Sequence, residues 1–253
     1  MIHIFLSGCL GRMGRTIASI AAASDDLWIV AGSDARIPEQ HDFPVFTHPV
    51  DCDIPFDVLI DFSNPAALPG LLDLIRARHC PAVICTTGLS DQQKAELDTL
   101  TAVAPIFISA NMSLGINILV DLARQAAALL YPEFNIEIIE AHHNQKVDAP
   151  SGTALLLAEQ IRDRLDDPDL NFVYDRSTRR EKRPDREIGI HAVRGGGIVG
   201  DHTVVLAGPE ETIELSHHAH SRAVFARGAL AAARFLVGQQ PGCYSMSDLL
   251  RRG

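Results

Sequence analysis

The stretch of the chain best suited to chemistry lies between residues 140 and 154 and reads EAHHNQKVDAPSGTA. It contains an adjacent pair of histidines, His142 and His143, followed by Lys146. Histidine titrates near neutral pH and can deliver a proton to carbon after a hydride has arrived. Lysine offers either a point charge for a carboxylate or a proton to a basic centre. We therefore expect proton-transfer chemistry and an acidic substrate at this segment.

The end of the same segment, Ser151, Gly152 and Thr153, stands where a helical pattern begins. The first turn of a helix presents free backbone N–H groups and a positive dipole end, and two hydroxyls add further hydrogen-bonding groups. A dicarboxylate site is therefore predicted. We expect no metal here, because adjacent histidines on an extended segment point to opposite faces and no cysteine or HExxH pattern completes a zinc site.

A glycine-rich loop near the start of the chain predicts a dinucleotide site. The sequence GCLGRMG, residues 8–14, follows an apolar run and opens a helical pattern, as a dinucleotide fingerprint requires. Its spacing is GxxGxxG and not GxGxxG, so the motif alone is also compatible with an ordinary glycine-rich turn. Asp34 strengthens the prediction, because it ends the next strand at the position of an acid that accepts ribose hydroxyls. The residues expected at the cofactor here are Gly8, Gly11, Arg12, Met13, Gly14, Asp34 and Arg36, the last as a partner for a 2′-phosphate.

Two later loops are expected on the nicotinamide side of the same site. Each follows a predicted strand, and ligands of open α/β sheets lie beyond the carboxyl ends of the strands. The expected residues are Thr86, Thr87 and Gly88 in one loop and Ala110, Asn111 and Met112 in the other.

The elements that must position these residues fall into two groups. In the first part, strands alternate with helices, which predicts βαβ units and a Rossmann-like, doubly wound parallel α/β sheet. The expected strands are 2–7, 28–33, 57–62, 82–86 and 106–109; the expected helices are 12–24, one opening at Pro65, and one capped by Ser90 with Gln93 in a capping box.

After Asn111 the pattern changes to that of an α+β domain with an open mixed sheet, mostly antiparallel. Helices are expected at 114–130, 151–165 and 223–236, and strands at 135–141, 187–194, 202–207 and 212–218. The polar stretch 166–184 is expected to be a mobile loop. The predicted division is a dinucleotide-binding domain, 1–113 with 223–253, and a substrate-binding and oligomerisation domain, 114–222.

Composition limits the other possibilities. The chain has 253 residues, a formal net charge of −10, and five cysteines with no CxxC spacing. The acidic balance argues against a nucleic-acid partner, and the cysteines suggest free thiols in a reducing compartment. No apolar run approaches a membrane span of about 20 residues, and the N-terminus lacks the basic region of a signal peptide. A cytoplasmic protein without a membrane partner is expected.

The segment 140–154 resembles the signature of the 4-hydroxy-tetrahydrodipicolinate reductase family, also called dihydrodipicolinate reductases. The resemblance covers essentially the whole chain. GCLGRMG is similar to the family's GxxGRMG loop, CTTG to its GTTG, and SANMS to its loop with a central asparagine. Residues 194–229 resemble the family's later sheet and last helix.

This resemblance implies the reduction of a cyclic, conjugated imine dicarboxylate by NADH or NADPH in lysine and diaminopimelate biosynthesis. Hydride reaches C4 of the dehydrated substrate, and the resulting enamine is protonated. By resemblance, His142 is the proton donor and Lys146 assists as donor and charge partner. The carboxylates are held by His143, Lys146, Ser151, Gly152 and Thr153. A homotetramer built through the second domain's sheet is also implied, with hinges near Ser113 and Arg222.

The sequence departs from the family pattern at three places. Cys9 and Cys85 stand where smaller residues are expected, and each adds a possible oxidisable thiol near the cofactor. Ala35 follows Asp34 where a basic residue would support NADPH, which favours NADH or use of both cofactors.

Three other classes of protein are compatible with parts of the pattern. An amino-acid or semialdehyde dehydrogenase shares the cofactor loop, but an acylating enzyme needs a cysteine in the substrate half, where none occurs. A redox-sensing dinucleotide-binding regulator needs a basic DNA-binding module, which this acidic chain lacks. A scaffold leaves the histidine, lysine and Ser-Gly-Thr group unexplained.

Overall fold

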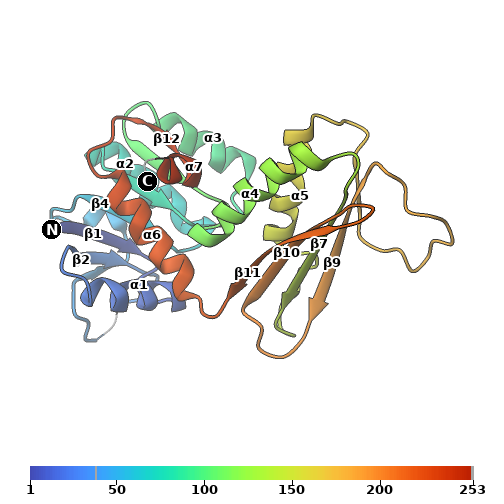
Figure 1. The fold of residues 1–253 in the computed structure, drawn as a ribbon. Helices are drawn as coiled ribbons and strands as arrows, with labels where there is room; N and C mark the ends of the chain where they lie inside the picture. Colours follow the sequence, from blue (N-terminus) through green and yellow to red (C-terminus); the bar gives the residue numbers. More distant parts are fainter. Residues whose placement is uncertain (38, 252–253) are drawn as a thin grey trace. The chain divides into compact units, whose positions relative to one another are not determined.

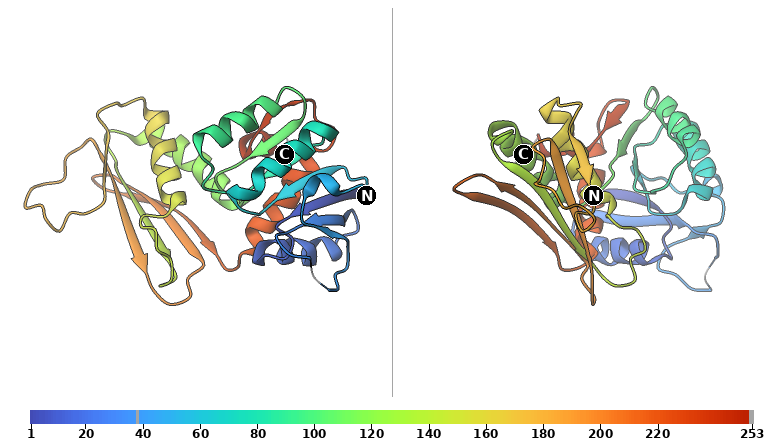
Figure 2. Two further views of the ribbon diagram at one scale, coloured as in Figure 1. Left: turned by 180° about the vertical axis from the view of Figure 1, so that it is seen from behind. Right: turned by 90° about the vertical axis from the view of Figure 1, so that its right-hand side faces the viewer.

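The chain forms two compact units (Figures 1 and 2). The computed structural model describes residues 1–37 and 39–251. The first unit comprises Met1–Leu114 with Arg222–Gly253, and the second comprises Gly115–Ser221. These divisions lie within one residue of the domain limits expected from the sequence.

The first unit is built on a seven-stranded parallel sheet with the order β12-β6-β5-β4-β1-β2-β3. This confirms the Rossmann-like, doubly wound sheet. The strands are β1 (Ile2–Ser7), β2 (Leu27–Ser33), β3 (Val45–Phe46), β4 (Val58–Asp61), β5 (Ala82–Ile84), β6 (Pro105–Ile108) and β12 (Gly242–Tyr244).

Helices cover both faces of this sheet. Because side chains alternate along each strand, successive residues enter the apolar clusters on opposite faces. In β1, Ile4 and Leu6 enter one apolar cluster, together with α1 (Arg12–Ala22) and α6 (Ala223–Leu236). Phe5 points the other way, into a cluster with α2 (Leu68–Arg78) and α3 (Asp91–Leu100). Figure 1 shows α6, from the end of the chain, lying beside strands from its beginning.

Several local predictions need adjustment. The helix expected to open at Pro65 begins as a 3-10 turn, η2 (Pro65–Ala67), before α2 continues it. The capping box of Ser90 and Gln93 is confirmed. Among the described residues of the first unit, four short elements were not predicted, because two to five residues carry too little periodicity to be recognised: β3, η1 (Pro49–Asp51), β12 and α7 (Met246–Leu250).

The second unit is an open mixed sheet with the order β11-β10-β7-β9-β8, and the helices α4 (Leu114–Leu130) and α5 (Gly152–Leu165) contribute to its apolar core. The mixed sheet is confirmed, but only two of its four strand pairings are antiparallel, β10 with β11 and β10 with β7. β7 pairs with β10 in the antiparallel sense but with β9 in the parallel sense, and β8 also runs parallel to β9. The chain from β7 to β9 passes through α5, a crossover that returns it in the same direction. The strands are β7 (Asn135–His142), β8 (Asn171–Val173), β9 (Glu187–Arg194), β10 (Gly200–Ala207) and β11 (Thr212–Ala219).

The polar stretch 166–184 is more ordered than the sequence suggests. It contains β8, and its arginines form ion pairs with carboxylates of the sheet. Glu137 accepts hydrogen bonds of 2.8 Å from both Arg176 and Arg183, and its Oε2 lies 2.7 Å from Nε2 of His191. Burial opposes ionisation of Glu137, but the bonds from Arg183 and His191 prevail and lower the pKa of this carboxyl. We call Glu137, Arg176, Arg183 and His191 the outer cluster.

No helix among the described residues is both long and apolar enough to cross a membrane.

Candidate active site

Strand β7 turns two ionisable side chains toward the interior of the second unit. Its buried positions alternate, with Ile136 and Ile138 followed by Glu140 and His142. The period of two places all four on the face that packs against α5. The buried face of β7 is therefore apolar in its first half and polar in its second half, directly before the loop 143–150.

The carboxylate of Glu140 is fully buried and accepts four hydrogen bonds. Its Oε1 accepts from Nη2 of Arg194 at 2.7 Å and from the amide of Ser151 at 3.0 Å. Its Oε2 accepts from Nη1 of Arg194 at 2.8 Å and lies 2.7 Å from Nδ1 of His142. Burial opposes ionisation of Glu140, but the bonds from Arg194 and His142 outweigh it and lower the pKa of this carboxyl. We call Glu140, His142, Arg194 and Ser151 the inner cluster.

The imidazole of His142 is held at one nitrogen and is without a partner at the other. Its Nδ1 faces Glu140, while its Nε2 makes no hydrogen bond to any residue that the structure describes. A Cβ at position 200 would lie 3.1 Å from Nε2, so Gly200 leaves the space beside this nitrogen open. A ring with one nitrogen fixed and the other open has the geometry of a proton donor or acceptor.

The start of α5 is tied to this site through Ser151. The Ser151 hydroxyl caps the helix by accepting from the amide of Ala154 at 3.1 Å, and it lies 2.9 Å from Nε2 of His202. Burial lowers the pKa of His202 to about 4, and the charge of the nearby His142 adds to the effect. His202 is therefore neutral at pH 7. The amide and hydroxyl of Ser151 are both engaged within the protein, whereas Gly152 is exposed and Thr153 is half-buried.

The loop that follows β7 holds the other residues expected at the substrate. Nζ of Lys146 lies 2.8 Å from the carboxylate of Asp148, and this bond lowers the pKa of Asp148. Nδ1 of His143 is buried without a hydrogen-bond partner among the described residues. A buried polar atom without a partner is costly, and a ligand oxygen would satisfy it. The structure thus gathers His142, His143, Lys146 and Ser151–Thr153 around one turn.

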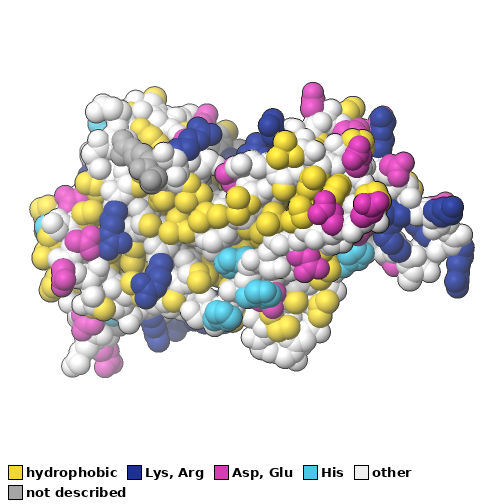
Figure 3. Space-filling model, in the orientation of Figure 1, with side chains coloured by type: hydrophobic (Ala, Val, Ile, Leu, Met, Phe, Trp, Pro, Cys, Tyr) yellow, Lys and Arg dark blue, Asp and Glu magenta, His cyan; other side chains and the backbone are white. Residues whose placement is uncertain are grey.

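Other histidines of this unit lie on β11 and just after it. His218 and His220 are exposed and His217 is half-buried, and Figure 3 shows histidine side chains gathered on this face. His218 lies 3.2 Å from Asp201 across the sheet. Among the described residues, no group of three or more His, Cys, Asp or Glu is arranged to hold a metal ion.

In the first unit, the glycine-rich loop leaves no room for side chains. Gly8 has a φ of +74°, and a Cβ there would come 2.5 Å from the carbonyl oxygen of Phe62. A Cβ on Gly14 would come 2.3 Å from the carbonyl oxygen of Gly8, so α1 packs tightly onto the loop. Gly11 occupies the N-cap of α1 and has no side chain to cap it, which leaves the first N–H groups of the helix for an anion. These residues fit the pyrophosphate of a dinucleotide.

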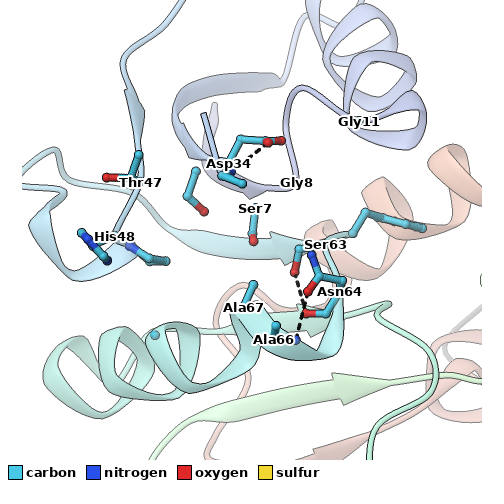
Figure 4. A pocket seen from close by; sticks show the side chains of 15 residues that line it. Ser7, Gly8, Gly11, Asp34, Thr47, His48, Ser63, Asn64, Ala66 and Ala67 are labelled. Atoms are coloured by element: carbon cyan, nitrogen blue, oxygen red, sulfur yellow. Dashed lines mark hydrogen bonds between the residues drawn. The ribbon is translucent and has the colours of Figure 1, made fainter. Parts of the chain in front are cut away.

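Asp34 lines two pockets beside this loop. Its Oδ2 accepts from the amide of Leu10 at 3.0 Å, which fixes the carboxylate against the loop. A pocket of about 460 Å³ is lined by Gly8, Gly11 and Asp34, with further polar side chains around it (Figure 4). A second pocket, of about 470 Å³, has Gly11, Asp34 and Arg36 in its wall. Residues that the sequence did not single out line the first pocket: Ser7, Ser33, Thr47, His48, Ser63 and Asn64.

The two loops expected near the nicotinamide follow β5 and β6, as predicted. Gly88 has a φ of +75°, and the hydroxyl of Thr86 is buried. Asn111 turns its side-chain oxygen onto the amide of Ser113 at 2.8 Å. Met112 is buried in the core, with its carbonyl packed against Gly228 of α6, and Met13 packs partly against the same core. The side chain of Met112 is therefore structural, whereas that of Met13 is only partly buried.

The expectation of oxidisable thiols beside the cofactor is wrong. Cys9 is completely buried, and burial raises the pKa of its thiol to about 12. Burial also raises the pKa of Cys85 well above its ordinary value. Reaction with oxidants needs an accessible thiolate, and neither side chain provides one.

Three residues of the inner site were missed or given no role: Glu140, Arg194 and His202. A signal existed for Glu140, since it falls in the buried phase of the alternation in β7. Arg194 and His202 are distant in sequence and reach the site only through strand pairing, where Arg194 stands opposite His142 and His202 opposite Glu140.

Comparison with known proteins agrees with both halves of this description. Residues 2–112 match the family model described as dihydrodipicolinate reductase, N-terminus, and residues 115–250 match the model of the C-terminus. The chain belongs to the dihydrodipicolinate reductase family. Members of this family use NADH or NADPH, which agrees with the residues of the glycine-rich loop.

Individual relatives extend over the full chain. The 4-hydroxy-tetrahydrodipicolinate reductase of Clostridium botulinum is 51% identical over 251 residues, covering 99% of this chain and 98% of the relative. That of Caldanaerobacter subterraneus subsp. tengcongensis is 48% identical over 253 residues, the whole of both chains. The dipicolinate-bound dihydrodipicolinate reductase of Paenisporosarcina sp. TG-14 has a similar structure, with a TM-score of 0.79, 25% identity and 97% coverage of each chain. A diaminopimelate dehydrogenase of Corynebacterium glutamicum, at 17% identity and a TM-score of 0.56, shares the fold.

Proposed function

We propose that this protein reduces 4-hydroxy-tetrahydrodipicolinate to tetrahydrodipicolinate with NADH or NADPH, in lysine and diaminopimelate biosynthesis. The observation that carries the proposal is the inner cluster: His142 has Nδ1 bound to a buried carboxylate, and its Nε2 has no partner within the part of the chain that the structure describes. It lies in a chain that matches the family over nearly its whole length.

In the proposed reaction His142 donates the proton. Bound NADH or NADPH supplies the hydride that reaches C4 of the dehydrated substrate, and the enamine that results accepts the proton from Nε2 of His142. Lys146 assists as a second donor and as a charge partner, since its ammonium already pairs with the exposed Asp148 and can exchange that partner for a substrate carboxylate.

The carboxylates of the substrate are proposed to bind at the turn into α5. His143 contributes a buried nitrogen that has no hydrogen-bond partner in residues 1–37 and 39–251, and Lys146 contributes charge. The helix start at Ser151, Gly152 and Thr153 contributes N–H groups and its dipole. Since the amide and hydroxyl of Ser151 bond to Glu140 and His202, the role of Ser151 is to shape this turn.

The cofactor is proposed to bind along the carboxyl edge of the first sheet. Pyrophosphate lies at the helix start formed by Gly8, Gly11, Arg12, Met13 and Gly14, and Asp34 accepts the ribose hydroxyls. Arg36 lines a pocket together with Gly11 and Asp34, where it would meet a 2′-phosphate, while Ala35 adds no charge. The nicotinamide side is assigned to Thr86, Thr87, Gly88, Ala110, Asn111 and Met112.

We further propose a homotetramer in the cytoplasm. The support for an oligomer is the open face of the second sheet, where Ile139 is 43% and Val193 50% exposed. Light scattering on the purified protein gives the mass directly. A monomer at micromolar concentration would contradict this part of the proposal.

The test of the reaction is loss of reduced-nicotinamide absorbance, with substrate made in the same vessel by the preceding synthase from pyruvate and aspartate semialdehyde. We expect loss that depends on the synthase, and the rates with NADH and NADPH measure the contributions of Asp34 and Arg36. A folded protein that binds dinucleotide but shows no loss with either cofactor would refute the proposal.

A further inference from the structure

The carboxylate of Glu140 has no capacity left for another hydrogen bond. A carboxylate has about four lone-pair sites, and here two donors of Arg194, the amide of Ser151 and Nδ1 of His142 occupy them. The side chain of Glu140 is 0% exposed, so water does not compete for these sites. Arg194 binds both oxygens in the paired geometry that fixes a carboxylate most firmly.

We propose that Glu140 and Arg194 are positioning residues for the proton transfer, holding His142 with a proton on Nδ1 so that Nε2 is the nitrogen that delivers a proton to the substrate. This inference rests on the role proposed for His142 above. An ionised carboxylate only accepts hydrogen bonds, so the nitrogen 2.7 Å from it must carry hydrogen. Arg194 contributes by keeping Glu140 charged in a buried place.

The transfer is balanced at the imidazole. Charged His142 loses the proton on Nε2, and the electron pair of the enamine forms the new C–H bond with it. The ring becomes neutral and retains its other proton on Nδ1, still bound to Glu140, which stays ionised throughout. Solvent then returns a proton to Nε2. A buried carboxylate that orients a histidine in this way, without itself taking the proton, is a known catalytic arrangement.

The surroundings of Nε2 agree with this assignment. His202 presents its ring edgewise to that of His142, with ring centres 5.2 Å apart, and bonds to Ser151 through its own Nε2. The backbone of His142 is also held, since its carbonyl accepts from the amide of Gly195 at 2.9 Å. The bond from Nδ1 to Glu140 and the edgewise contact with His202 restrict the ring, and a Cβ at position 200 would lie 3.1 Å from Nε2, a space that Gly200 leaves open.

The first experiment measures the tautomer in the unaltered protein without substrate. The protein is labelled with ¹⁵N at histidine, and the signals of His142 are identified by their loss in His142→Asn. For the neutral ring we expect nitrogen shifts with the proton on Nδ1. A neutral ring protonated mainly on Nε2 would overturn the proposal. Since no turnover is involved, this result is independent of the proposed reaction.

The second experiment removes the charge of Glu140 with Glu140→Gln. The amide then turns an N–H donor toward Nδ1 while its oxygen accepts from Arg194, so the proton of the neutral ring moves to Nε2. We expect kcat to fall about 100-fold, in the range of a lost acid–base function, with little change in KM for the dinucleotide. Unchanged kcat and unchanged nitrogen shifts in this variant would overturn the proposal.

A matched control is Glu137→Gln, which removes a carboxylate of the same strand from a similar group of arginines and a histidine. It should lower stability and leave both kcat and the shifts of His142 unchanged. Because Glu140→Gln leaves Arg194 buried without its counter-charge, folding is checked by circular dichroism. Arg194→Lys provides a milder variant that keeps the charge and should lower kcat several-fold while the proton stays on Nδ1. If Arg194→Lys lowers kcat as much as Glu140→Gln while the proton stays on Nδ1, Arg194 acts other than by positioning the proton, and its assigned role is wrong.

The outcomes separate the two proposals. Reductase activity with the proton on Nε2 of the neutral ring would refute the positioning role alone. A proton on Nδ1 in a protein without reductase activity would refute the proposed function and leave the geometry of the inner cluster as inferred.

Discussion

Strand β7 carries two clusters of the same residue types that differ in burial and in the direction of the histidine. In the outer cluster, Glu137 is 20% exposed and binds Nε2 of His191, which is itself 39% exposed. In the inner cluster, Glu140 is fully buried and binds Nδ1 of His142, which is 11% exposed. Composition therefore does not distinguish an anchor for a loop from a site for proton transfer. The orientation of the imidazole and the exclusion of water do so.

The largest expected difference between the clusters is in turnover. Replacing His142 with Ala should lower kcat by about 100- to 10,000-fold, because a general acid is lost, and should change KM for the substrate much less. Replacing His191 with Ala should leave kcat unchanged, because this ring only supports Glu137. Steady-state kinetics of the two variants measures this. Equal losses in both would remove the distinction between the clusters.

The outer cluster should show its effect in stability. Glu137→Gln removes the charge that holds Arg176 and Arg183, and hydrogen bonds to charged groups are worth about 1.5–3 kcal/mol each. We expect the free energy of unfolding to fall by on the order of 2 kcal/mol, and trypsin to cleave more rapidly within 174–186. Urea titration and timed proteolysis test this, with the exposed Glu214→Gln as control. If both variants resist trypsin equally, the arginines do not order this stretch.

Acid should act on the inner cluster through His202. In the unfolded chain this histidine titrates near 6.5, whereas burial lowers its pKa to about 4 in the folded protein. Between these values the unfolded state binds more protons, so stability falls as pH decreases from about 6.5 to 4. The loss between pH 7 and pH 5 should be about 2 kcal/mol. Unfolding curves at both pH values test this, and His202→Asn should flatten the dependence. A slope that survives in this variant would assign the titration elsewhere.

The smallest effect should come from filling the space beside Nε2 of His142. A Cβ at position 200 would lie 3.1 Å from this nitrogen, so Gly200→Ala should lower kcat by about tenfold through displacement of the ring. Gly197→Ala is the control, since a Cβ there meets nothing within 4 Å. Activity and melting temperature are measured for both. Full activity in Gly200→Ala would mean that access to Nε2 does not limit the reaction.

The inner cluster also shows which features could be predicted from the sequence and which could not. Local patterns were sufficient for the long helices, the parallel strands and the polar segment 140–154, because periodicity and capping are encoded within a few residues. They were insufficient for the partners of that segment. Arg194 lies opposite His142 only because β9 pairs with β7 in one register, and this pairing is settled by the whole sheet. The parallel sense of that pair was missed for the same reason.

The ion pairs that hold the stretch 166–184 could not be predicted either, because they also depend on residues distant in sequence. Its arginines look like a solvated charge run in the sequence. The carboxylates that bind them stand on β7 and at the start of β9, where Glu137 and Glu187 present them to the loop. A charge run is ordered only where the opposite charges are already fixed by the fold.

The discontinuity of the first unit has a consequence for how the chain is made. Helix α6 and strand β12 belong to the first unit but follow the second in the sequence, and Gly228 of α6 packs on the carbonyl of Met112 beside the dinucleotide loops. A ribosome therefore releases every residue of the second unit before the first can be completed. Domains fold as units during synthesis, usually from the N-terminus onward. Here the first unit is completed last, and residues 1–114 must wait with one face of their sheet covered by α1 alone until α6 emerges.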